Sequence, residues 1–172
     1  MHEGAYRFIA GMVGKLEPRR SVIELGSRTV AGAWPFSGPV RPLFTAAGHY
    51  LGVDIAAGPN VDVVGNAASW QPDPHRLVDT VVCCETLEHT PEAPEICDNA
   101  HWLLDAGGVF LVTAAGVGRA QHSAVDGGPL RDGEFYRNVS DEELRLWLKP
   151  FGFALIDTTT HGDIYGLAVK LQ

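Results

Sequence analysis

The stretch SVIELGSRTVAGAW, residues 21–34, decides how the rest of the chain is interpreted. It begins with a short apolar run that contains Glu24 and ends at Gly26, and a loop of small and polar residues follows. A buried strand that leads through a glycine into such a loop is typical of nucleotide-binding α/β sheets. The dinucleotide fingerprint G-x-G-x-x-G is incomplete, because Gly32 lies too far beyond Gly26. The stretch by itself therefore leaves the ligand open.

The composition predicts one domain covering residues 1–172. A chain of 172 residues buries a sizeable core, and 45% hydrophobic with 20% charged residues is the balance of a soluble globular protein. The net charge of -8 and the lack of a Lys/Arg run argue against an extended nucleic-acid surface, which needs clustered cations. A small or neutral partner fits this charge better.

The cysteines and the N-terminus indicate a cytoplasmic protein without a membrane anchor. Cys83, Cys84 and Cys97 lack metal-ligand spacing and are interpreted as core thiols, so neither a metal site nor a disulfide framework is expected. Arg7 and Lys15 interrupt the apolar residues near the N-terminus, which excludes a signal-peptide pattern, and no apolar run reaches transmembrane length.

Periodicity predicts alternating helices and strands over the first two thirds of the chain. Apolar residues repeat with helical spacing over residues 4–16, within an N-terminal helical segment 1–17 that Pro18 ends. Thr90-Pro91-Glu92 opens a second helix with a capping hydroxyl, a proline and an acid, and this helix ends at Gly107-Gly108. A short helix is expected at residues 41–47. The expected strands are residues 22–25, 50–55, 61–64, 78–84 and 109–114.

The last third begins with a polar, glycine-rich segment, residues 115–139. It is too long for a plain connection and is therefore expected to be a functional loop or lid. Ser140 and Glu143 form a capping box that opens the last helix. Two strands, residues 153–159 and 164–171, follow and are joined by a short turn at residues 161–163.

These elements predict an α/β fold with a doubly wound sheet. The sheet is mostly parallel with an antiparallel hairpin at the C-terminal edge, and helices cover both faces. In such sheets ligands bind at the carboxyl ends of the strands. Asp54 ends the second strand, where its two oxygens can take both hydroxyls of a ribose or cap the next turn. Asn66 follows the third strand, where it can meet a base edge or hold its own turn.

Four strand ends taken in order, IELGS, GVDI, VGNA and CCETLEH, resemble those of the class I S-adenosylmethionine-dependent methyltransferases. The last is similar to the E-x-L-E-H segment of members that modify small molecules and glycans. The resemblance covers roughly residues 22–116 and implies a Rossmann-like fold, S-adenosylmethionine as cofactor, and a small molecule or glycan precursor as methyl acceptor.

The resemblance also implies roles for individual residues. Glu24 would lie near the methionine end of the cofactor, and Gly26 would let the backbone approach it. Asp54 would bind the ribose, Asn66 would face adenine, and Glu85 would line the methionine side. The complete implied cofactor set is Glu24, Gly26, Ser27, Asp54, Ile55, Asn66, Ala67, Cys84, Glu85 and Leu87.

Two departures from the family pattern concern the loop after the first strand. Arg28 and Val30 replace expected glycines, and the interval from Glu24 to Asp54 is longer than usual, which makes residues 27–39 a candidate lid over the cofactor. A non-catalytic binding or regulatory module is the alternative that such departures leave open. An NAD(P)-dependent oxidoreductase is disfavoured, because Gly26 lacks the partner glycines of a pyrophosphate cradle.

The acceptor side contributes the candidate catalytic residues. Methyl transfer depends mainly on orientation, but an alcohol or phenol acceptor also needs a base. His89 follows the fourth strand and has an ordinary pKa near neutrality, so it is a candidate base or else a hydrogen-bonded structural histidine. His122 in the segment 115–139 is the second candidate. Asp126, Tyr136 and Arg137 lie in the same segment, and Arg137 would suit a carboxylate or phosphate.

Overall fold

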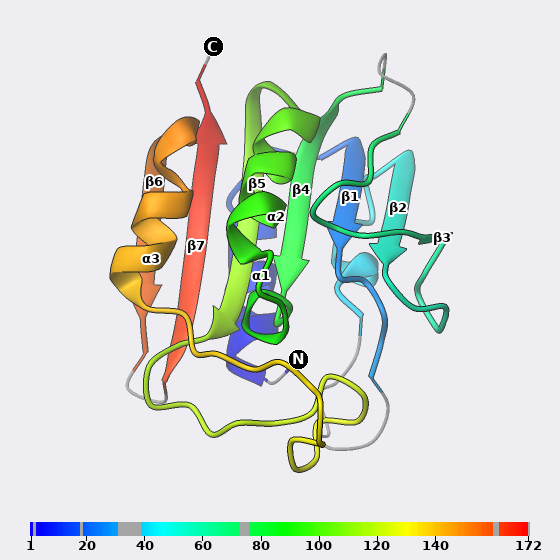
Figure 1. Cartoon of the computed structure of the whole chain (residues 1–172). Helices are drawn as coiled ribbons and strands as arrows, with labels where there is room; N and C mark the ends of the chain where they lie inside the picture. Colours follow the sequence, from blue (N-terminus) through cyan, green and yellow to red (C-terminus); the bar gives the residue numbers. More distant parts are fainter. Residues whose placement is uncertain (2, 18, 31–38, 73–75, 160–161, 172) are drawn as a thin grey trace.

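The protein forms one seven-stranded mixed sheet in a computed structural model that describes residues 1, 3–17, 19–30, 39–72, 76–159 and 162–171 (Figure 1). The strand order is β3-β2-β1-β4-β5-β7-β6. The strands are β1 (Ser21–Leu25), β2 (His49–Asp54), β3 (Val63–Val64), β4 (Val78–Cys84), β5 (Leu104–Ala115), β6 (Gly152–Thr158) and β7 (Asp163–Lys170).

The predicted topology is confirmed. Strands β1 to β5 pair in parallel, whereas β7 pairs antiparallel with both β5 and β6. The C-terminal hairpin therefore forms one edge of the sheet, with β7 inserted between β5 and β6. Six of the seven residues of β4 are buried, because both faces of this strand are covered. Its sequence therefore does not alternate between polar and apolar residues.

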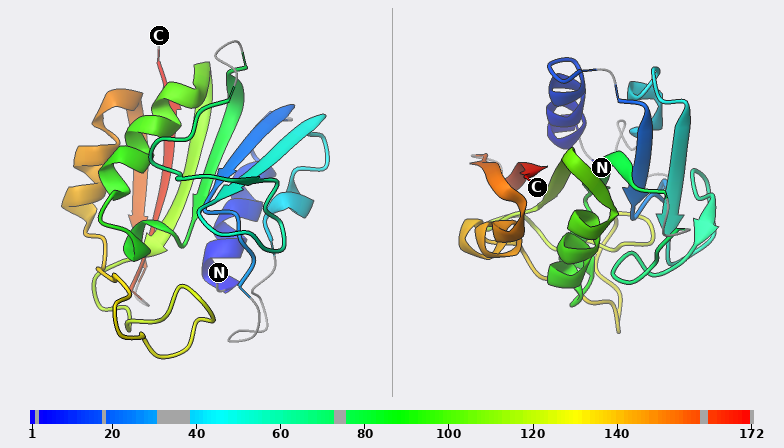
Figure 2. Two further views of the ribbon diagram at one scale, coloured as in Figure 1. Left: turned by 45° about the vertical axis from the view of Figure 1, so that its right-hand side comes forward. Right: turned by 90° about the horizontal axis from the view of Figure 1, so that it is seen from above.

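Helices cover both faces of the sheet, as predicted (Figure 2). Helix α1 (Glu3–Val13) packs on one face, and α2 (Ala93–Leu103) and α3 (Asp141–Trp147) pack on the other. The α1 face has its own core around Ile9, Val22 and Val82, and the opposite face has the larger core, which includes Leu103, Phe110 and other buried residues. Cys83, Cys84 and Cys97 are buried free thiols, as expected.

Several predicted boundaries are wrong. Helix α2 begins at Ala93 rather than at Thr90, because the Thr90 hydroxyl accepts a hydrogen bond from the Glu92 amide in a separate turn ahead of the helix. It ends at Leu103, and the glycines at 107 and 108 belong to β5, which is longer than expected.

Shorter elements also differ from expectation. Helix α1 ends at Val13, before Pro18, which lies outside the described residues. The expected helix at residues 41–47 is a single 3₁₀ turn, Arg41–Leu43, with a proline at its start, and β3 keeps two of four expected residues. The capping box of α3 is confirmed, because the Ser140 hydroxyl accepts from the Glu143 amide and the Glu143 carboxylate accepts from the Ser140 amide.

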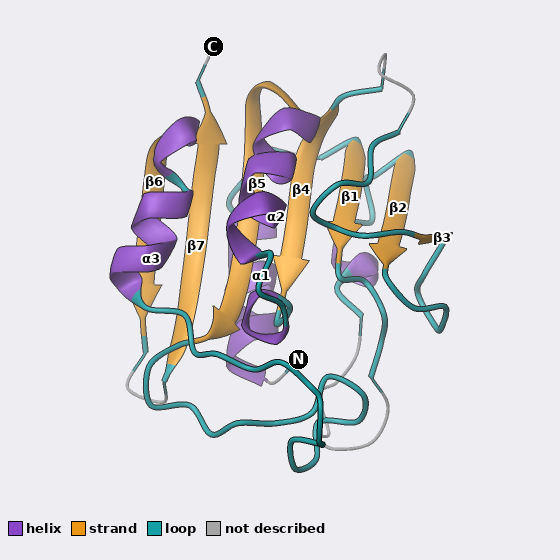
Figure 3. Cartoon of the chain, in the orientation of Figure 1, coloured by secondary structure: helices purple, strands orange, loops and turns teal. Residues whose placement is uncertain are grey.

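The long segment at residues 115–139 runs as a loop along the carboxyl ends of the strands (Figure 3). Backbone hydrogen bonds attach it at both ends: the Val139 amide donates to the Ala115 carbonyl, and the Gly116 amide donates to the Gly162 carbonyl. The Arg137 amide donates to the carbonyl of Glu88 beyond β4. The segment is thus fixed over the sheet edge where ligands bind in this architecture. Among the described residues, no helix combines the length and apolar character needed to cross a membrane.

Candidate functional site

A cavity of about 270 Å³ opens at the carboxyl ends of β1, β2 and β4. One side is formed by residues that end these strands, among them Gly26, Asp54 and Glu85. The other side is formed by His89 and by the segment 115–139, which contributes His122 and its neighbours. Two parts of the sequence that were predicted separately to hold cofactor and acceptor therefore share one cavity.

Gly26 lines this cavity in a conformation that requires glycine. Its φ is +77°, and a Cβ at this position would lie 2.0 Å from the Thr86 hydroxyl oxygen. Its amide and the next one both donate to the carbonyl of Val53 on β2, which fixes the turn. The backbone is therefore bare where β1 meets the cavity.

Asp54 ends β2 with its side chain largely buried at the cavity wall. One carboxylate oxygen accepts from the Arg28 amide at 3.0 Å, and the other accepts from the Ala56 amide at 3.0 Å. Each carboxylate oxygen has a second lone pair, so the group retains acceptor capacity toward the cavity. The predicted capping role is observed, and it leaves room for a ribose role beside it.

Asn66 and Ala67 also line the cavity, but the Asn66 amide is already engaged. Its oxygen accepts from the Ala68 amide at 2.9 Å, and its nitrogen donates to the Glu92 carboxylate at 3.1 Å. The turn-holding role is thus what the structure shows for Asn66. Glu92, which the sequence predicted only as an acid that opens a helix, lies beside it at the cavity wall.

Glu24 lies beneath the site instead of lining the cavity. Its carboxylate accepts hydrogen bonds of 2.8 Å from the Tyr50 hydroxyl and from the Asn60 amide, and Asn60 also donates to the Ser27 carbonyl. Burial raises the pKa of Glu24 to about 7, although these hydrogen bonds oppose the shift. Glu24 therefore supports the turn after β1 from inside the protein.

The remaining members of the predicted cofactor set divide into two groups. Ile55 and Glu85 line the cavity, and Glu85 has an unusual positive φ of 52° at the end of β4. Ser27, Cys84 and Leu87 are buried and are not among the described residues that line it. Leu87 packs in the larger core. These three residues are therefore part of the protein interior next to the strand ends and not part of the cavity wall.

The two histidines predicted from sequence meet at the acceptor side. Their ring centroids lie 4.9 Å apart, and the Tyr136 ring packs against both, at 5.3 Å from His89 and 5.1 Å from His122. Burial and the neighbouring His122 lower the pKa of His89 to about 4, so its imidazole is neutral at physiological pH. His89 Nδ1 is buried and has no hydrogen-bond partner among the described residues, which argues against a hydrogen-bonded structural role.

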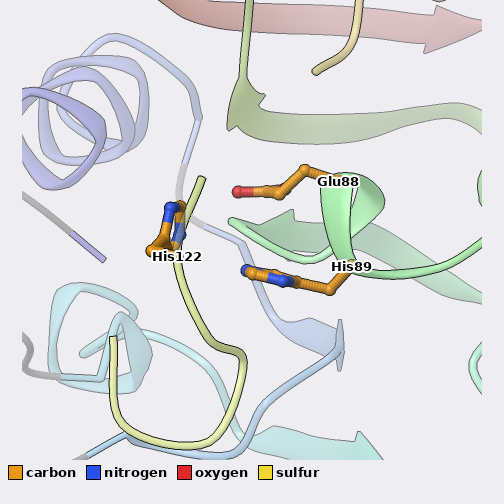
Figure 4. A group of neighbouring side chains, drawn as sticks. All are labelled: Glu88, His89 and His122. Atoms are coloured by element: carbon orange, nitrogen blue, oxygen red, sulfur yellow. The ribbon is translucent and has the colours of Figure 1, made fainter. Parts of the chain in front are cut away.

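Glu88 is a site residue that sequence reasoning missed. It lies in the 3₁₀ turn Leu87–His89, is fully buried, and directs its carboxylate toward the two histidines (Figure 4). Burial, and then the charge of Glu85, hold the pKa of this carboxyl well above its usual range. One oxygen accepts from the Ala115 amide at 3.2 Å. The family resemblance assigned roles to Glu85, Leu87 and His89 in the segment CCETLEH, but the sequence did not show that the Glu88 side chain meets the two histidines.

Arg28 was seen in the sequence as a departure from the family pattern, and it proves to be part of the site. Its guanidinium donates to the Ala124 carbonyl at 3.0 Å and lies 3.8 Å from the Asp54 carboxylate, so it connects the cofactor side to the segment 115–139. The rest of the candidate lid at residues 27–39 lies mostly outside the described residues.

Two other predicted residues have partners of their own. Asp126 lines the cavity and pairs with Arg131 at 2.5 Å. Arg137 pairs with Glu143 on α3 at 3.1 Å and is not among the described residues that line the cavity, so the suggested anion-binding role finds no support here.

A mostly parallel sheet with this strand order, and with a cavity at its carboxyl edge, is typical of Rossmann-like α/β folds, which bind ligands at that edge. Residues 1–158 match the family described as "Methyltransferase domain", and the chain therefore belongs to that family. The predicted membership of the class I S-adenosylmethionine-dependent methyltransferases is thereby confirmed. No curated protein matches the chain in sequence.

Solved structures share the fold at low sequence identity. The Burkholderia thailandensis 1,6-didemethyltoxoflavin-N1-methyltransferase, solved with 1,6-didemethyltoxoflavin and S-adenosylhomocysteine, is 17% identical with a TM-score of 0.66 over 99% of this chain and 80% of that chain. DhpI with S-adenosylhomocysteine is 22% identical with a TM-score of 0.66 over 98% and 83%. A putative methyltransferase solved with the Haloferax volcanii Trm112 activator is 13% identical with a TM-score of 0.67 over 99% and 90%.

Proposed function

We propose that this protein transfers the methyl group of S-adenosylmethionine to a small-molecule acceptor bound between the strand ends and the segment 115–139. The observation that carries the proposal is the shared cavity, in which Gly26 and Asp54 face His89 and His122. Donor and acceptor must lie in one enclosed space for direct in-line displacement. A cavity formed by the sheet edge alone would not favour transfer over simple binding.

The residues at the strand ends fit an adenosyl cofactor. The bare backbone at Gly26 admits a ligand close to β1, because any Cβ there would collide with Thr86. The Asp54 carboxylate has acceptor capacity for two ribose hydroxyls. Glu85 is held in a sparsely populated backbone conformation at the cavity wall, and such strain is concentrated at functional sites. We therefore assign Asp54 to the ribose and Gly26 with Glu85 to the methionine side.

The adenine end is assigned to Asn66, Ala67 and Glu92. The Asn66 amide is held by its own turn and by Glu92, so its orientation is fixed before a ligand arrives. The Glu92 carboxylate, which lines the same wall, is an acceptor suited to an exocyclic amino group. The neutral Asn66 thus acts together with a carboxylate from a later part of the chain.

The catalytic contribution of the chain is mainly orientation. Bound S-adenosylmethionine supplies an electrophilic methyl group on a positively charged sulfur. The segment 115–139 forms one side of the cavity, and Arg28 connects it to the cofactor side through the Ala124 carbonyl. For a hydroxyl acceptor, we assign the departing proton to the neutral imidazole of His89, or to that of His122, whose ring lies beside it. A neutral amine acceptor attacks through its own lone pair and loses a proton only after the transfer, so it needs no base in that step.

Two observations support a small organic molecule as the acceptor, the size of the cavity and the ligand of a structural neighbour. A cavity of about 270 Å³ lies just below the range for small-molecule sites, roughly 300–1,000 Å³. A methyltransferase of similar fold was solved with the small heterocycle 1,6-didemethyltoxoflavin. These points support a small organic acceptor, and a glycan precursor remains the second candidate within the same proposal.

The test is a calorimetric titration with S-adenosylmethionine, S-adenosylhomocysteine and NADH. We expect both adenosyl ligands to bind and NADH to fail. Binding of NADH alone would replace the proposal with the oxidoreductase alternative, and binding of none would favour a non-catalytic module. Formation of S-adenosylhomocysteine with panels of phenols, amines, heterocycles and sugars then identifies the acceptor class.

A further inference from the structure

Three potential metal ligands converge at the acceptor end of the cavity. One ligand atom from each of Glu88, His89 and His122 lies within 4.8 Å of the others. Glu88 and His89 come from the 3₁₀ turn after β4 and point side by side toward His122, which comes from the segment 115–139 (Figure 4). Segments that are distant in the sequence thus place three donors around one point.

The Glu88 carboxylate supplies the second observation. Its residue is fully buried, and its Oε2 atom has no hydrogen-bond partner among the described residues. A buried acceptor without a partner carries an uncompensated desolvation cost, which is larger if the group is charged. The neighbouring His89 Nδ1 is buried and unpaired as well. A cation bound by these residues would give the buried polar atoms of this group a partner.

Contacts around the three residues resemble the outer support of metal ligands. Glu88 Oε1 accepts from the Ala115 amide, which orients the carboxylate. His122 Nδ1 lies 3.2 Å from the Ala120 carbonyl, an arrangement that leaves Nε2 as the available donor atom. Ligating histidines commonly use their second nitrogen on a backbone carbonyl in this way. The Tyr136 hydroxyl donates to the same Ala120 carbonyl and holds that part of the loop.

We propose that Glu88, His89 and His122 bind one divalent transition-metal ion at the acceptor end of the cavity. Two imidazoles and one carboxylate suit Zn²⁺ or Fe²⁺, whereas Mg²⁺ prefers oxygen ligands throughout. Three protein ligands leave coordination positions open, and His89 and His122 both line the cavity. The open positions therefore face the space assigned to the acceptor.

The role of the ion rests on the proposed function. With the ion bound, His89 and His122 would act as ligands and not as bases. A hydroxyl oxygen of the acceptor bound to the ion would lose its proton to water more readily, because the cation stabilises the oxyanion. That oxygen forms the new bond to the methyl carbon as the carbon–sulfur bond breaks, and the electron pair stays on sulfur. Binding of the ion itself requires no cofactor, so it can be tested separately.

The experiment titrates the full chain, stripped with a chelator, with Co²⁺ as a spectroscopic probe and then with Zn²⁺ as a competitor. We expect one Co²⁺ per chain, visible d–d absorption, and displacement by Zn²⁺. Glu88→Gln and His122→Ala should each weaken Co²⁺ binding by at least about tenfold. His101→Ala is the matched control, because His101 packs on Phe151 away from the cavity and should leave binding unchanged.

Folding is checked in the same samples. Zn²⁺ should raise the midpoint of thermal unfolding of the wild type and of His101→Ala, but not of the two ligand variants. His122 lies on a loop, so His122→Ala tests the site even if Glu88→Gln unfolds. The proposal is overturned if Co²⁺ binding does not saturate at one per chain, or if both variants bind as the wild type does. Calorimetry with S-adenosylhomocysteine on the metal-free chain distinguishes this failure from failure of the proposed function.

Discussion

Replacing Gly26 by alanine tests the claim that the turn after β1 needs a bare backbone. Two costs are expected to add. The positive φ of 77° costs an L-residue about 1–2 kcal/mol, and the new Cβ would lie 2.0 Å from the Thr86 hydroxyl and 2.8 Å from Thr86 Cβ. Overpacking of this kind costs roughly 1–3 kcal/mol, so the free energy of unfolding should fall by about 2–5 kcal/mol.

Gly107 is a matched control that separates the two costs. Its φ is +78°, almost the same as that of Gly26, but a Cβ there would meet no atom within 4 Å. Gly107→Ala should therefore show the conformational cost alone, about 1–2 kcal/mol. The difference between the two variants measures the collision with Thr86.

Urea unfolding monitored by tryptophan fluorescence gives the free energies, and Gly26→Ala should be at least about 1 kcal/mol less stable than Gly107→Ala. In a Thr86→Gly background, which removes the colliding side chain, Gly26→Ala should lower the free energy of unfolding by less than it does in the wild type. Calorimetry should also show weaker binding of S-adenosylhomocysteine by Gly26→Ala and normal binding by Gly107→Ala. Equal stabilities of the two alanine variants would refute the close approach of Gly26 and Thr86.

Three further predictions concern other parts of the site and fold. The pKa of Glu24 is raised from 4.5 to about 7, so the free energy of unfolding should fall by about 3 kcal/mol as pH rises through this interval. Glu24→Gln should flatten this pH dependence in urea unfolding between pH 5 and 8. The same pH dependence in the wild type and in Glu24→Gln would contradict the shift. Arg28→Met keeps the aliphatic stem but loses the bond to the Ala124 carbonyl, so hydrogen exchange at residues 123–128 should accelerate, whereas unchanged exchange would argue against a tether. Ser140→Ala removes the helix cap and should lower stability by about 1 kcal/mol in thermal unfolding, and an unchanged midpoint would count against the cap.

The sheet could be predicted from sequence because its signals are local. The apolar run of β4 and the alternation of strands and helices indicated a parallel sheet. The family resemblance indicated which strand ends would lie at the ligand site. Boundaries were less accurate where two local signals competed. The hydroxyl of Thr90 forms a turn instead of a helix cap, and α2 begins three residues later, with Pro94 in its first turn.

The site was predictable where a residue ends a strand, and less so where side chains from distant segments meet. Gly26 and Asp54 lie at the cavity because strand direction places them there. Glu24 comes from the same motif but faces Tyr50 and Asn60, because its position in the pleat sends it away from the cavity. The convergence of Glu88 with His122 depends on the path of a long loop, which no periodicity encodes.

The most direct test of the account compares binding of S-adenosylhomocysteine by the wild type, Asp54→Ala and Asp62→Ala. Asp62 is the control, because it also accepts from a β2 amide, that of Gly52 at 2.7 Å, but is not among the described residues that line the cavity. Loss of charged hydrogen bonds to a ribose should weaken binding by Asp54→Ala about 10- to 100-fold, whereas Asp62→Ala should bind as the wild type does. No binding by the wild type, or equal affinity in Asp54→Ala, would contradict the assignment of this cavity to an adenosyl cofactor.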